Sequence, residues 1–387
     1  MGRRLDPGAL SSLMARLRVI GGRRLRALAC LLAAWLALLL VCSGSPRARA
    51  WAMRTGALGV LWTPVVVMIT AAFEPGAAVE YAAIAVLALT AGGLSDRMAP
   101  WPRALIAPAL AAPIAITADA LARGQLLMRS LLGPDPALGS RFYGIGNELK
   151  SGLAVLALAG VAAALHPGSR GRPAQRAMIA AGLGLAVIEG SSRIGAGVGG
   201  VILVSLAFAL ATVLSGPGAL NRRRTLLVVL APVAGLLALA AIDLAFAGGR
   251  GHFSGRILQA SSPADVREEI LRRYGAAFAE LGNHAMPIAT ALALALGIAG
   301  ARRGGRLLAP VGGDPVWRAA LAGGLAAGVT GALAEDSGPV LLIVAVFALG
   351  CVLSYLWGRP AGARRDTPGK GPATRSRARR LPAEPVR

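Results

Sequence analysis

The strongest constraint on the fold is a series of apolar runs, each about 18 residues long, that recurs along the chain. Only 15% of the 387 residues are charged, against about 25% in an average soluble domain, and the mean hydropathy is +0.62. In hydrocarbon every backbone polar group must be paired internally, so apolar runs of this length form helices. The sequence therefore excludes a cytosolic enzyme, a disordered chain and a secreted disulfide scaffold. It predicts an all-α polytopic transmembrane helical bundle with about 10–11 spans.

The candidate spans are rich in alanine and glycine. They are residues 27–42, 55–73, 77–94, 104–122, 151–165, 177–190, 194–214, 225–247, 285–300, 319–334 and 338–357. Small residues let helices approach closely, and Gly324 and Gly328 predict such a contact face. We expect one transmembrane domain, 27–357, between a basic N-terminal segment, 1–26, and a basic disordered cytoplasmic tail, 358–387.

Arginines predict the orientation of the chain. The net charge is +23, and arginines crowd three short loops, 166–176, 215–224 and 301–318, as well as the tail. Two spans separate each of these segments from the next, so all four can be cytoplasmic together, as the positive-inside rule requires. The prediction is a multi-pass protein of the inner (cytoplasmic) membrane with its C-terminus in the cytoplasm. Basic segments beside apolar spans bind anionic headgroups, so the expected partner is membrane lipid and not nucleic acid.

Aromatic and acidic residues near the span ends have simple interpretations. Trp101, Trp317 and Trp357 lie beside the cytoplasmic segments, as an aromatic belt would. Glu80 and Asp119 lie near span ends and are expected to reach water. Residues 264–274 look like an amphipathic helix, with acids early and arginines late, that would lie over the outer face.

The N-terminal region carries a conflict. Eleven spans with a cytoplasmic C-terminus place the N-terminus outside, yet residues 1–26 contain seven arginines and 43–54 contain three more. Both segments cannot be cytoplasmic if 27–42 spans the membrane, so either that segment lies in the interface or an early span is miscounted. A signal peptide cleaved near residues 48–50 is an alternative, but the neighbouring arginines disfavour cleavage, and we expect an uncleaved first helix.

Four polar clusters fall in the segments that this orientation places outside, 123–150, 190–193, 248–284 and 335–337. The clusters are residues 139–150, 189–193, 250–256 with 283–284, and 335–339. A charge at membrane depth costs about 2.5–3.5 kcal/mol on insertion scales, so such residues are usually functional or paired. Independent solvated turns would explain the Gly, Asn, Ser and Pro of these clusters but not their arginines or acids. We therefore expect one shared polar site.

Three other motifs have plainer interpretations. Residues 195–200 fit the glycine pattern of dinucleotide-binding folds, but a membrane helix follows and no acid lies in range, so these glycines are expected to serve helix packing. The serines of the clusters lack the turn pattern of a catalytic nucleophile. The two outer histidines could bind metal with Glu335 and Asp336, but lone histidines are more often structural, and the three cysteines show no ligand spacing. We predict no cofactor and no metal.

Two of the clusters resemble known membrane proteins. The run Arg-Phe-Tyr-Gly-Ile-Gly-Asn-Glu at 141–148, with Glu-Asp-Ser-Gly at 335–338, resembles a group of polytopic bacterial membrane proteins without an established activity. Residues 139–300 also resemble the O-antigen ligase and polymerase superfamily. There a Gly…Gly-Asn motif opens one helix, as Gly144 to Asn147 does, and a Ser-Arg-Gly-like motif opens another, as Ser192 to Gly195 does. A large outer loop with Arg and His follows, as 248–284 does, and the resemblance implies a cell-envelope glycan ligase.

The residues themselves support a transferase for a polyprenyl-diphosphate-linked sugar at the outer face. Arginine binds phosphate through two parallel hydrogen bonds, and a leaving diphosphate needs positive charge already in place. The expected clamp is Arg141, Arg193 and Arg256. The candidate bases for an acceptor hydroxyl are Glu148, His252 and His284. The other candidate substrate-binding residues are Asn147, Lys150, Ser192, Glu335 and Asp336.

Two other functions stay open at this point. A transporter or flippase for an anionic solute or lipid would use the polar interruption at 190–196 as a broken helix, with Glu189 and Asp243 on its pathway. The lack of an inverted repeat, and the position of the polar groups at one face, disfavour it. A membrane scaffold would act through its basic tails, so removing 360–387 would destroy its function.

Overall fold

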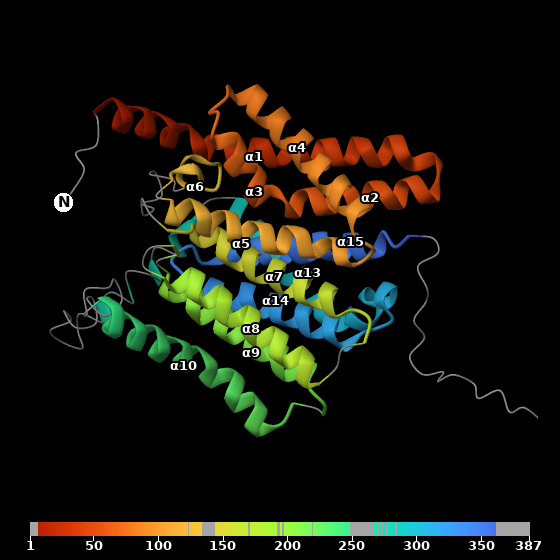
Figure 1. The fold of residues 1–387 in the computed structure, drawn as a ribbon, viewed down its shortest axis with the longest axis vertical. Coiled ribbons are helices and arrows are strands. Elements are labelled where there is room, and N and C mark those ends of the chain that lie inside the picture. Colours follow the sequence, from red (N-terminus) through yellow and green to blue (C-terminus); the bar gives the residue numbers. More distant parts are fainter. Residues whose placement is uncertain are drawn as a thin grey trace, which may run out of the picture.

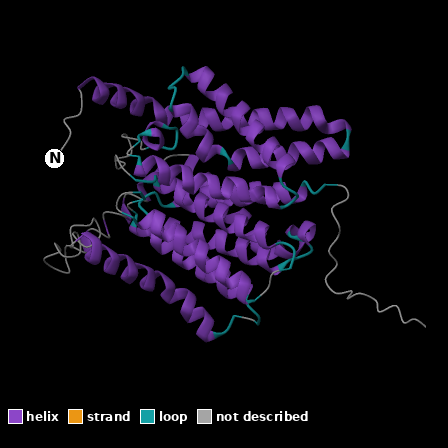
Figure 2. Cartoon of the chain, in the orientation of Figure 1, coloured by secondary structure: helices purple, strands orange, loops and turns teal. Residues whose placement is uncertain are grey.

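The computed structural model is a bundle of long helices that run back and forth between two ends (Figure 1). It describes residues 7–122, 124–133, 144–168, 171–191, 194–195, 197–218, 220–247, 267–268, 271, 274–275, 278–282 and 285–360. The helices are α1 (Pro7–Val41), α2 (Pro46–Leu61), α3 (Thr63–Ala71), α4 (Ala77–Met98), α5 (Ile106–Leu121), α6 (Leu126–Arg129), α7 (Asn147–Leu165), α8 (Arg172–Gly190), α9 (Val198–Ser215), α10 (Arg222–Ala247), α13 (Ala285–Leu307), α14 (Pro315–Ala334) and α15 (Pro339–Trp357). No strand occurs among these residues (Figure 2).

The predicted fold class is confirmed. Within the described ranges nine helices are long and apolar enough to cross a membrane, or ten spans if the bent pair α2–α3 counts as one. The helix α8 packs along α9 but is not among them. The chain is thus a multi-pass integral membrane protein, and its outward-facing apolar side chains suit contact with lipid.

Glycines bring the central helices close together. The carbonyl oxygen of Ala207 in α9 lies 2.8 Å from where a Cβ on Gly323 of α14 would stand. Gly324 faces Leu349 and Gly328 faces Ala345, both on α15, so the predicted small-residue contact face is confirmed. Close packing of α7, α9, α14 and α15 makes the centre of the bundle, whereas α10 and α13 lie at its margin with most of their surface exposed.

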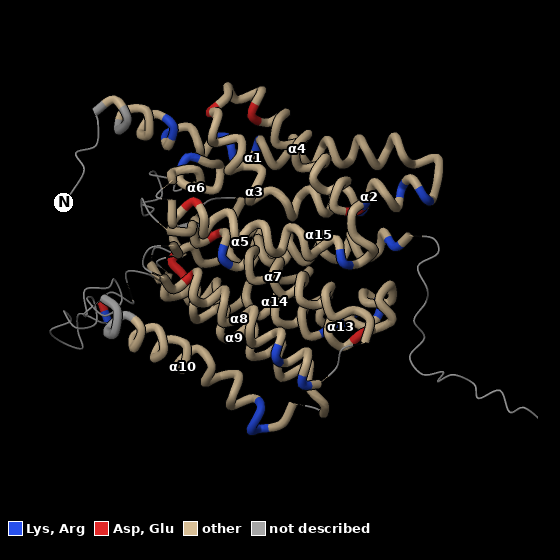
Figure 3. Tube along the Cα trace, in the orientation of Figure 1, with Lys and Arg blue, Asp and Glu red and all other residues tan. Residues whose placement is uncertain are grey.

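The charges divide between the two ends of the bundle (Figure 3). We call the end where α1 and α7 begin the glutamate end, since most of the described acids gather there. We call the opposite end, where α1 ends and α15 ends, the basic end. Hydrogen bonds between distant segments define the basic end: Arg54 Nη1 donates to the carbonyl oxygen of Gly358 at 2.5 Å, and Arg359 Nη1 donates to that of Pro310 at 3.0 Å.

Several expectations for the N-terminal half need correction. The predicted span 27–42 is part of the 35-residue helix α1, and the predicted span 55–73 is two helices bent by 58°. The bend falls at Trp62, just before Pro64, because proline has no N–H to continue the helical bonding and its ring clashes with the preceding turn. Trp317 does not join an aromatic belt, since its side chain is completely buried in the first turn of α14.

Two arginines of α1 form ion pairs inside the bundle, which bears on the basic segments on both sides of the first span. Arg16 and Arg23 bind Glu80 of α4, with 2.8 Å between Arg23 Nη1 and Glu80 Oε2. Glu80 is fully buried, so the expectation that it reaches water is wrong. Asp119, by contrast, receives the backbone N–H groups of Leu126 and Leu127, at 3.2 and 3.1 Å. Part of the N-terminal arginine charge is thus neutralised within the bundle.

Candidate functional site

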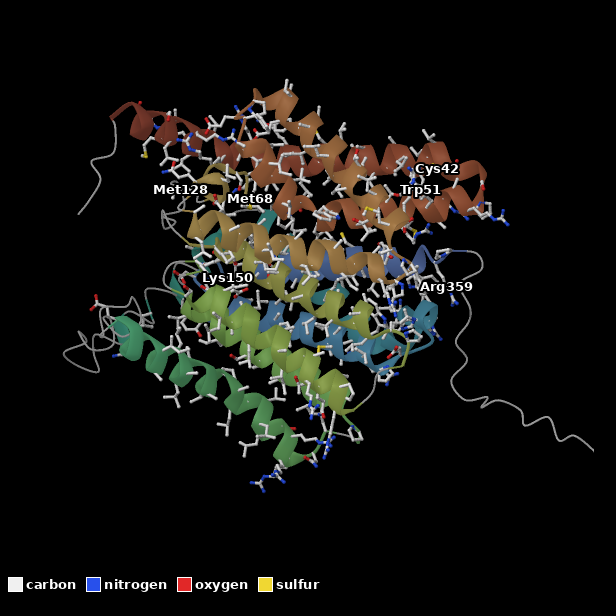
Figure 4. All side chains as sticks on the ribbon, viewed as in Figure 1. Cys42, Trp51, Met68, Met128, Lys150 and Arg359 are labelled. Atoms are coloured by element: carbon white, nitrogen blue, oxygen red, sulfur yellow. The ribbon has the colours of Figure 1, made fainter. Side chains whose placement is uncertain are left out.

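The candidate site lies at the glutamate end, where the central helices turn. There α7 and α9 begin, α8 and α14 end, and α15 starts after a short turn. Gly144, with a φ of 85°, precedes α7, and Gly338, with a φ of 45°, precedes α15, a backbone region that glycine enters readily. Figure 4 shows Lys150 toward this end of the bundle and Arg359 toward the other.

Lys150 forms a buried ion pair with Glu335. Lys150 Nζ lies 2.5 Å from Glu335 Oε1 and donates a second hydrogen bond to Asn147 Oδ1 at 2.9 Å. The side chains of Lys150 and Glu335 are 0% and 2% exposed. The pair joins the start of α7 to the end of α14, which lie 185 positions apart in the sequence. A charge pair this deeply buried persists only with such close partners, because both ions have lost their water.

Glu189 is a second buried carboxyl beside this pair. It stands one residue before the end of α8, its exposed fraction is 0%, and both carboxyl oxygens lack a hydrogen-bond partner among the described residues. Lys150 and Glu335 are its charged neighbours. Its backbone carbonyl accepts the N–H of Gly197 at 3.0 Å, which ties the end of α8 to the start of α9. A second carboxyl thus lies near the Lys150–Glu335 ion pair without a hydrogen bond to it.

The first turn of α9 is shaped around these three side chains. A Cβ on Gly200 would stand 2.5 Å from Glu189 Oε2, and one on Gly199 would stand 2.5 Å from the carboxyl carbon of Glu335. A Cβ on Gly197 would lie 2.8 Å from Lys150 Cε. Each glycine therefore leaves room for a different charged residue. The glycine run that looks like a dinucleotide-binding pattern packs against the charged cluster.

The helix ends at the site favour negative charge. The helices α7, α9 and α15 all begin here, after Gly146, Gly197 and Gly338, and none has a side-chain cap. Free backbone N–H groups and the positive end of the helix dipole attract anions. The buried carboxyls of Glu189 and Glu335 lie against the first turn of α9, so part of this field already acts on them.

A second charged layer lies beside the cluster and is more open to solvent. Arg24 Nη1 lies 3.6 Å from Glu148 Oε1, with the two side chains 24% and 28% exposed. Arg24 also donates to the carbonyl oxygen of Gly133. Arg129 binds Glu74, and its backbone carbonyl oxygen accepts a hydrogen bond from Arg16 Nε at 2.9 Å. Arg24 of α1 thus reaches Glu148 at the start of α7, next to the buried site.

The structure brings together some of the predicted site residues. Lys150 contacts both Asn147 and Glu335, whereas Glu148 lies beside Arg24 of the second layer. Asp336 follows Glu335, and its Oδ1 atom is buried without a partner among the described residues. Six predicted residues lie outside the described residues: Arg141, Ser192, Arg193, His252, Arg256 and His284. Asp243 and most of 264–274 also fall where no side chain is described.

Sequence reasoning missed three residues of this end. Glu189 appears in the second polar cluster and on the pathway of the transporter alternative, but not among the candidate residues of the transferase, and its position in an apolar helix was the available signal. Arg24 and Glu80 belong to segments with no apparent link to the clusters. Only the packing of α1 against α4 and the adjacent start of α7 reveals that Glu80 pairs with Arg23 and that Arg24 lies beside Glu148.

The basic end holds a pair between a histidine and an aspartate. His166 Nδ1 lies 2.9 Å from Asp314 Oδ2, and Asp314 also caps α14 by accepting the N–H of Val316 at 3.0 Å. Burial acts to raise the pKa of Asp314, but the hydrogen bonds from His166 and Val316 outweigh it, so the pKa lies below its ordinary value. This pair joins the end of α7 to the start of α14.

The described part of the chain contains no set of side chains suited to bind a metal ion. No group of three or more His, Cys, Asp or Glu side chains in those residues could hold a metal ion. Comparisons of the chain with protein-family models, with curated proteins and with solved structures found no match.

Proposed function

We propose that this membrane protein is a cell-envelope transferase that acts on a polyprenyl-diphosphate-linked sugar at the glutamate end. The observation that carries this function is the gathering of three uncapped helix starts and Arg24 at one end of the bundle. Such an end attracts the phosphates of a lipid-linked substrate whose polyprenyl chain stays in the bilayer.

The transfer reaction needs positive charge to bind the diphosphate and a base to accept the hydroxyl proton. Lys150 is committed to Glu335, so the charge that meets the diphosphate comes from Arg24 and from the predicted clamp, Arg141, Arg193 and Arg256. In the reaction the bond between the sugar's anomeric carbon and the diphosphate oxygen breaks, and a bond to the acceptor's hydroxyl oxygen forms. The hydroxyl proton passes to a base, and the diphosphate leaves with the bonding electron pair. Preorganised arginines stabilise that growing negative charge.

Glu148 is the described residue best suited to be the base. It stands in the first turn of α7, is partly exposed, and lies beside Arg24 without a hydrogen bond to it. A carboxylate in such a position can accept a proton from a hydroxyl that reaches it. The predicted bases His252 and His284 stay alternatives to it in this proposal.

The orientation belongs to the same proposal. The basic end, which holds the arginine-rich loops and the start of the C-terminal tail, would face the cytoplasm of a bacterial inner membrane. The glutamate end would then face outward, where lipid-linked glycans are used. The arginines Arg16, Arg23 and Arg24 of α1 at that end are paired with Glu80 and Glu148, so they oppose this orientation less than their number suggests.

Transport has less support than transfer. The polar interruption at 190–196 would have to be an unwound centre of one span, but α8 and α9 pack side by side around it. That segment joins two antiparallel helices at an end of the bundle. The buried charges lie at the same end and not halfway along the helices, where transporter sites are expected.

The test is glycan transfer by arginine variants. Arg141→Ala and Arg193→Ala, expressed in cells that lack the native copy, should each abolish transfer of a radiolabelled polyprenyl-diphosphate-linked sugar in isolated membranes. The matched control is Arg176→Ala, which removes an arginine from the basic end of α8 and should transfer normally. Normal transfer by both test variants at normal protein levels would refute the proposal. Lipid-linked sugar that accumulates without any covalent product in wild-type membranes would favour transport instead.

A further inference from the structure

We infer that Glu189 is a proton-binding site: its carboxyl carries an exchangeable proton as long as Lys150 is paired with Glu335. This goes beyond the proposed transfer reaction and does not depend on it. Three observations of the structure support it: Glu189 is fully buried, its two carboxyl oxygens have no hydrogen-bond partner among the described residues, and the neighbouring ammonium of Lys150 is already paired with Glu335.

If Glu189 and Glu335 were both ionised, the cluster would carry one more negative charge than Lys150 can balance. Lys150 from α7 and Glu335 from α14 are the charged residues that face Glu189, and the first turn of α9 that covers it holds no titratable side chain. Arg193, four positions after Glu189, lies outside the described residues. One ammonium and two ionised carboxylates would leave an unpaired negative charge away from water, which buried acids avoid by taking up a proton.

A proton fits this space better than a metal ion. Metal ions need several oxygen or nitrogen ligands around them, and no described group of His, Cys, Asp or Glu supplies such a set. Gly200 lies so close to Glu189 Oε2 that even a Cβ would clash. A proton on the carboxyl needs no added volume, and it turns one oxygen into a hydrogen-bond donor.

Proton loss would rearrange the cluster. Lys150 has three N–H groups, of which Glu335 and Asn147 receive one each. An ionised Glu189 would compete for the ammonium, so Lys150 would lie between two carboxylates. The protonation of Glu189 thereby couples the end of α8 to the end of α14 through one lysine on α7.

Infrared difference spectroscopy of the full-length chain in phospholipid nanodiscs tests this inference. Exchange of H₂O for D₂O shifts the C=O stretching band of a protonated carboxyl, whose amplitude counts the protonated acids. Glu189→Gln should lose the amplitude of one carboxyl. Lys150→Met should raise the amplitude of the cluster two-fold, because Glu335 must then be protonated too. Glu335→Gln should lose the band, because Lys150 is free to pair with an ionised Glu189.

The control is Glu148→Gln, a partly exposed acid of the second layer, which should leave the band unchanged. Glu189→Gln replaces a neutral acid by a neutral amide of the same shape, so it should keep the melting temperature of the wild type, whereas Lys150→Met should lower it. A wild-type band that survives unchanged in Glu189→Gln would overturn the inference. So would a loss of stability in Glu189→Gln as large as in Lys150→Met.

Discussion

A double-variant cycle on Glu189 and Glu335 is the sharpest test of the buried cluster. Each carboxyl alone can serve as the partner of Lys150, whose side chain is 0% exposed. Glu189→Gln should change the free energy of unfolding by less than about 0.5 kcal/mol, because one neutral group replaces another. Glu335→Gln should cost about 1–2 kcal/mol, since a charged hydrogen bond at 2.5 Å is exchanged for the carboxylate of Glu189.

The double variant should lose more than the sum of the two. With both carboxylates gone, the ammonium of Lys150 keeps only Asn147, at 2.9 Å, and an uncompensated buried charge costs about 3–5 kcal/mol. The coupling between the two substitutions is then about 1–3 kcal/mol, a size that residues in one charged network show.

The measurement is equilibrium unfolding of the full-length chain in mixed detergent micelles, followed by the fluorescence of its six tryptophans. The control cycle is Glu74→Gln with Glu148→Gln, two acids paired with arginines near the surface. Each control should cost less than about 1 kcal/mol, and the two should add. Additive effects of the Glu189 and Glu335 variants, within about 0.5 kcal/mol, would refute the idea that both carboxyls serve one lysine.

Two further predictions concern the packing around the cluster and the opposite end. Gly200→Ala should destabilise the protein by about 1–3 kcal/mol in the same unfolding assay, because its Cβ would stand 2.5 Å from Glu189 Oε2, whereas Gly184→Ala on α8 meets open space and should not destabilise. Stability should also fall as the pH drops below about 4, because the lowered pKa of Asp314 stabilises the folded state at pH values above the unfolded-state pKa of about 3.9, and that contribution is lost as the carboxyl is protonated. Asp314→Asn should flatten this slope in melting curves, and an unchanged slope would show that the pair with His166 does not contribute.

Much of the architecture could be predicted from the sequence. Apolar runs of about 18 residues have few solutions in a bilayer, so helices and their approximate positions follow from composition. The prediction was weakest where local chemistry opposed the pattern. Proline near Trp62 divides one expected span into α2 and α3, and the arginines between residues 16 and 26 belong to the same helix as the apolar run that follows.

The candidate site could be predicted only in part. The polar clusters at 139–150, 189–193 and 335–339 were recognisable as charges that a membrane helix does not need. Lys150 and Glu335 were both among the candidates, but nothing in their positions showed that they bind each other. Glu189 looked like one acid of a turn, and the glycines of α9 looked like an ordinary packing motif.

The sequence by itself determined that this chain lies in a membrane as a helical bundle, because the cost of unpaired backbone in hydrocarbon acts on every residue alike. It also determined which residues are too polar for their surroundings, since that depends only on local composition. The tertiary structure alone decided which of those residues meet. Lys150 and Glu335 are 185 positions apart, and their contact depends on how α7, α9 and α14 pack through their glycines. The attraction between two charges weakens when the helices that carry them move apart by a few ångströms. A pattern along the chain therefore could not specify which charged residues form a pair.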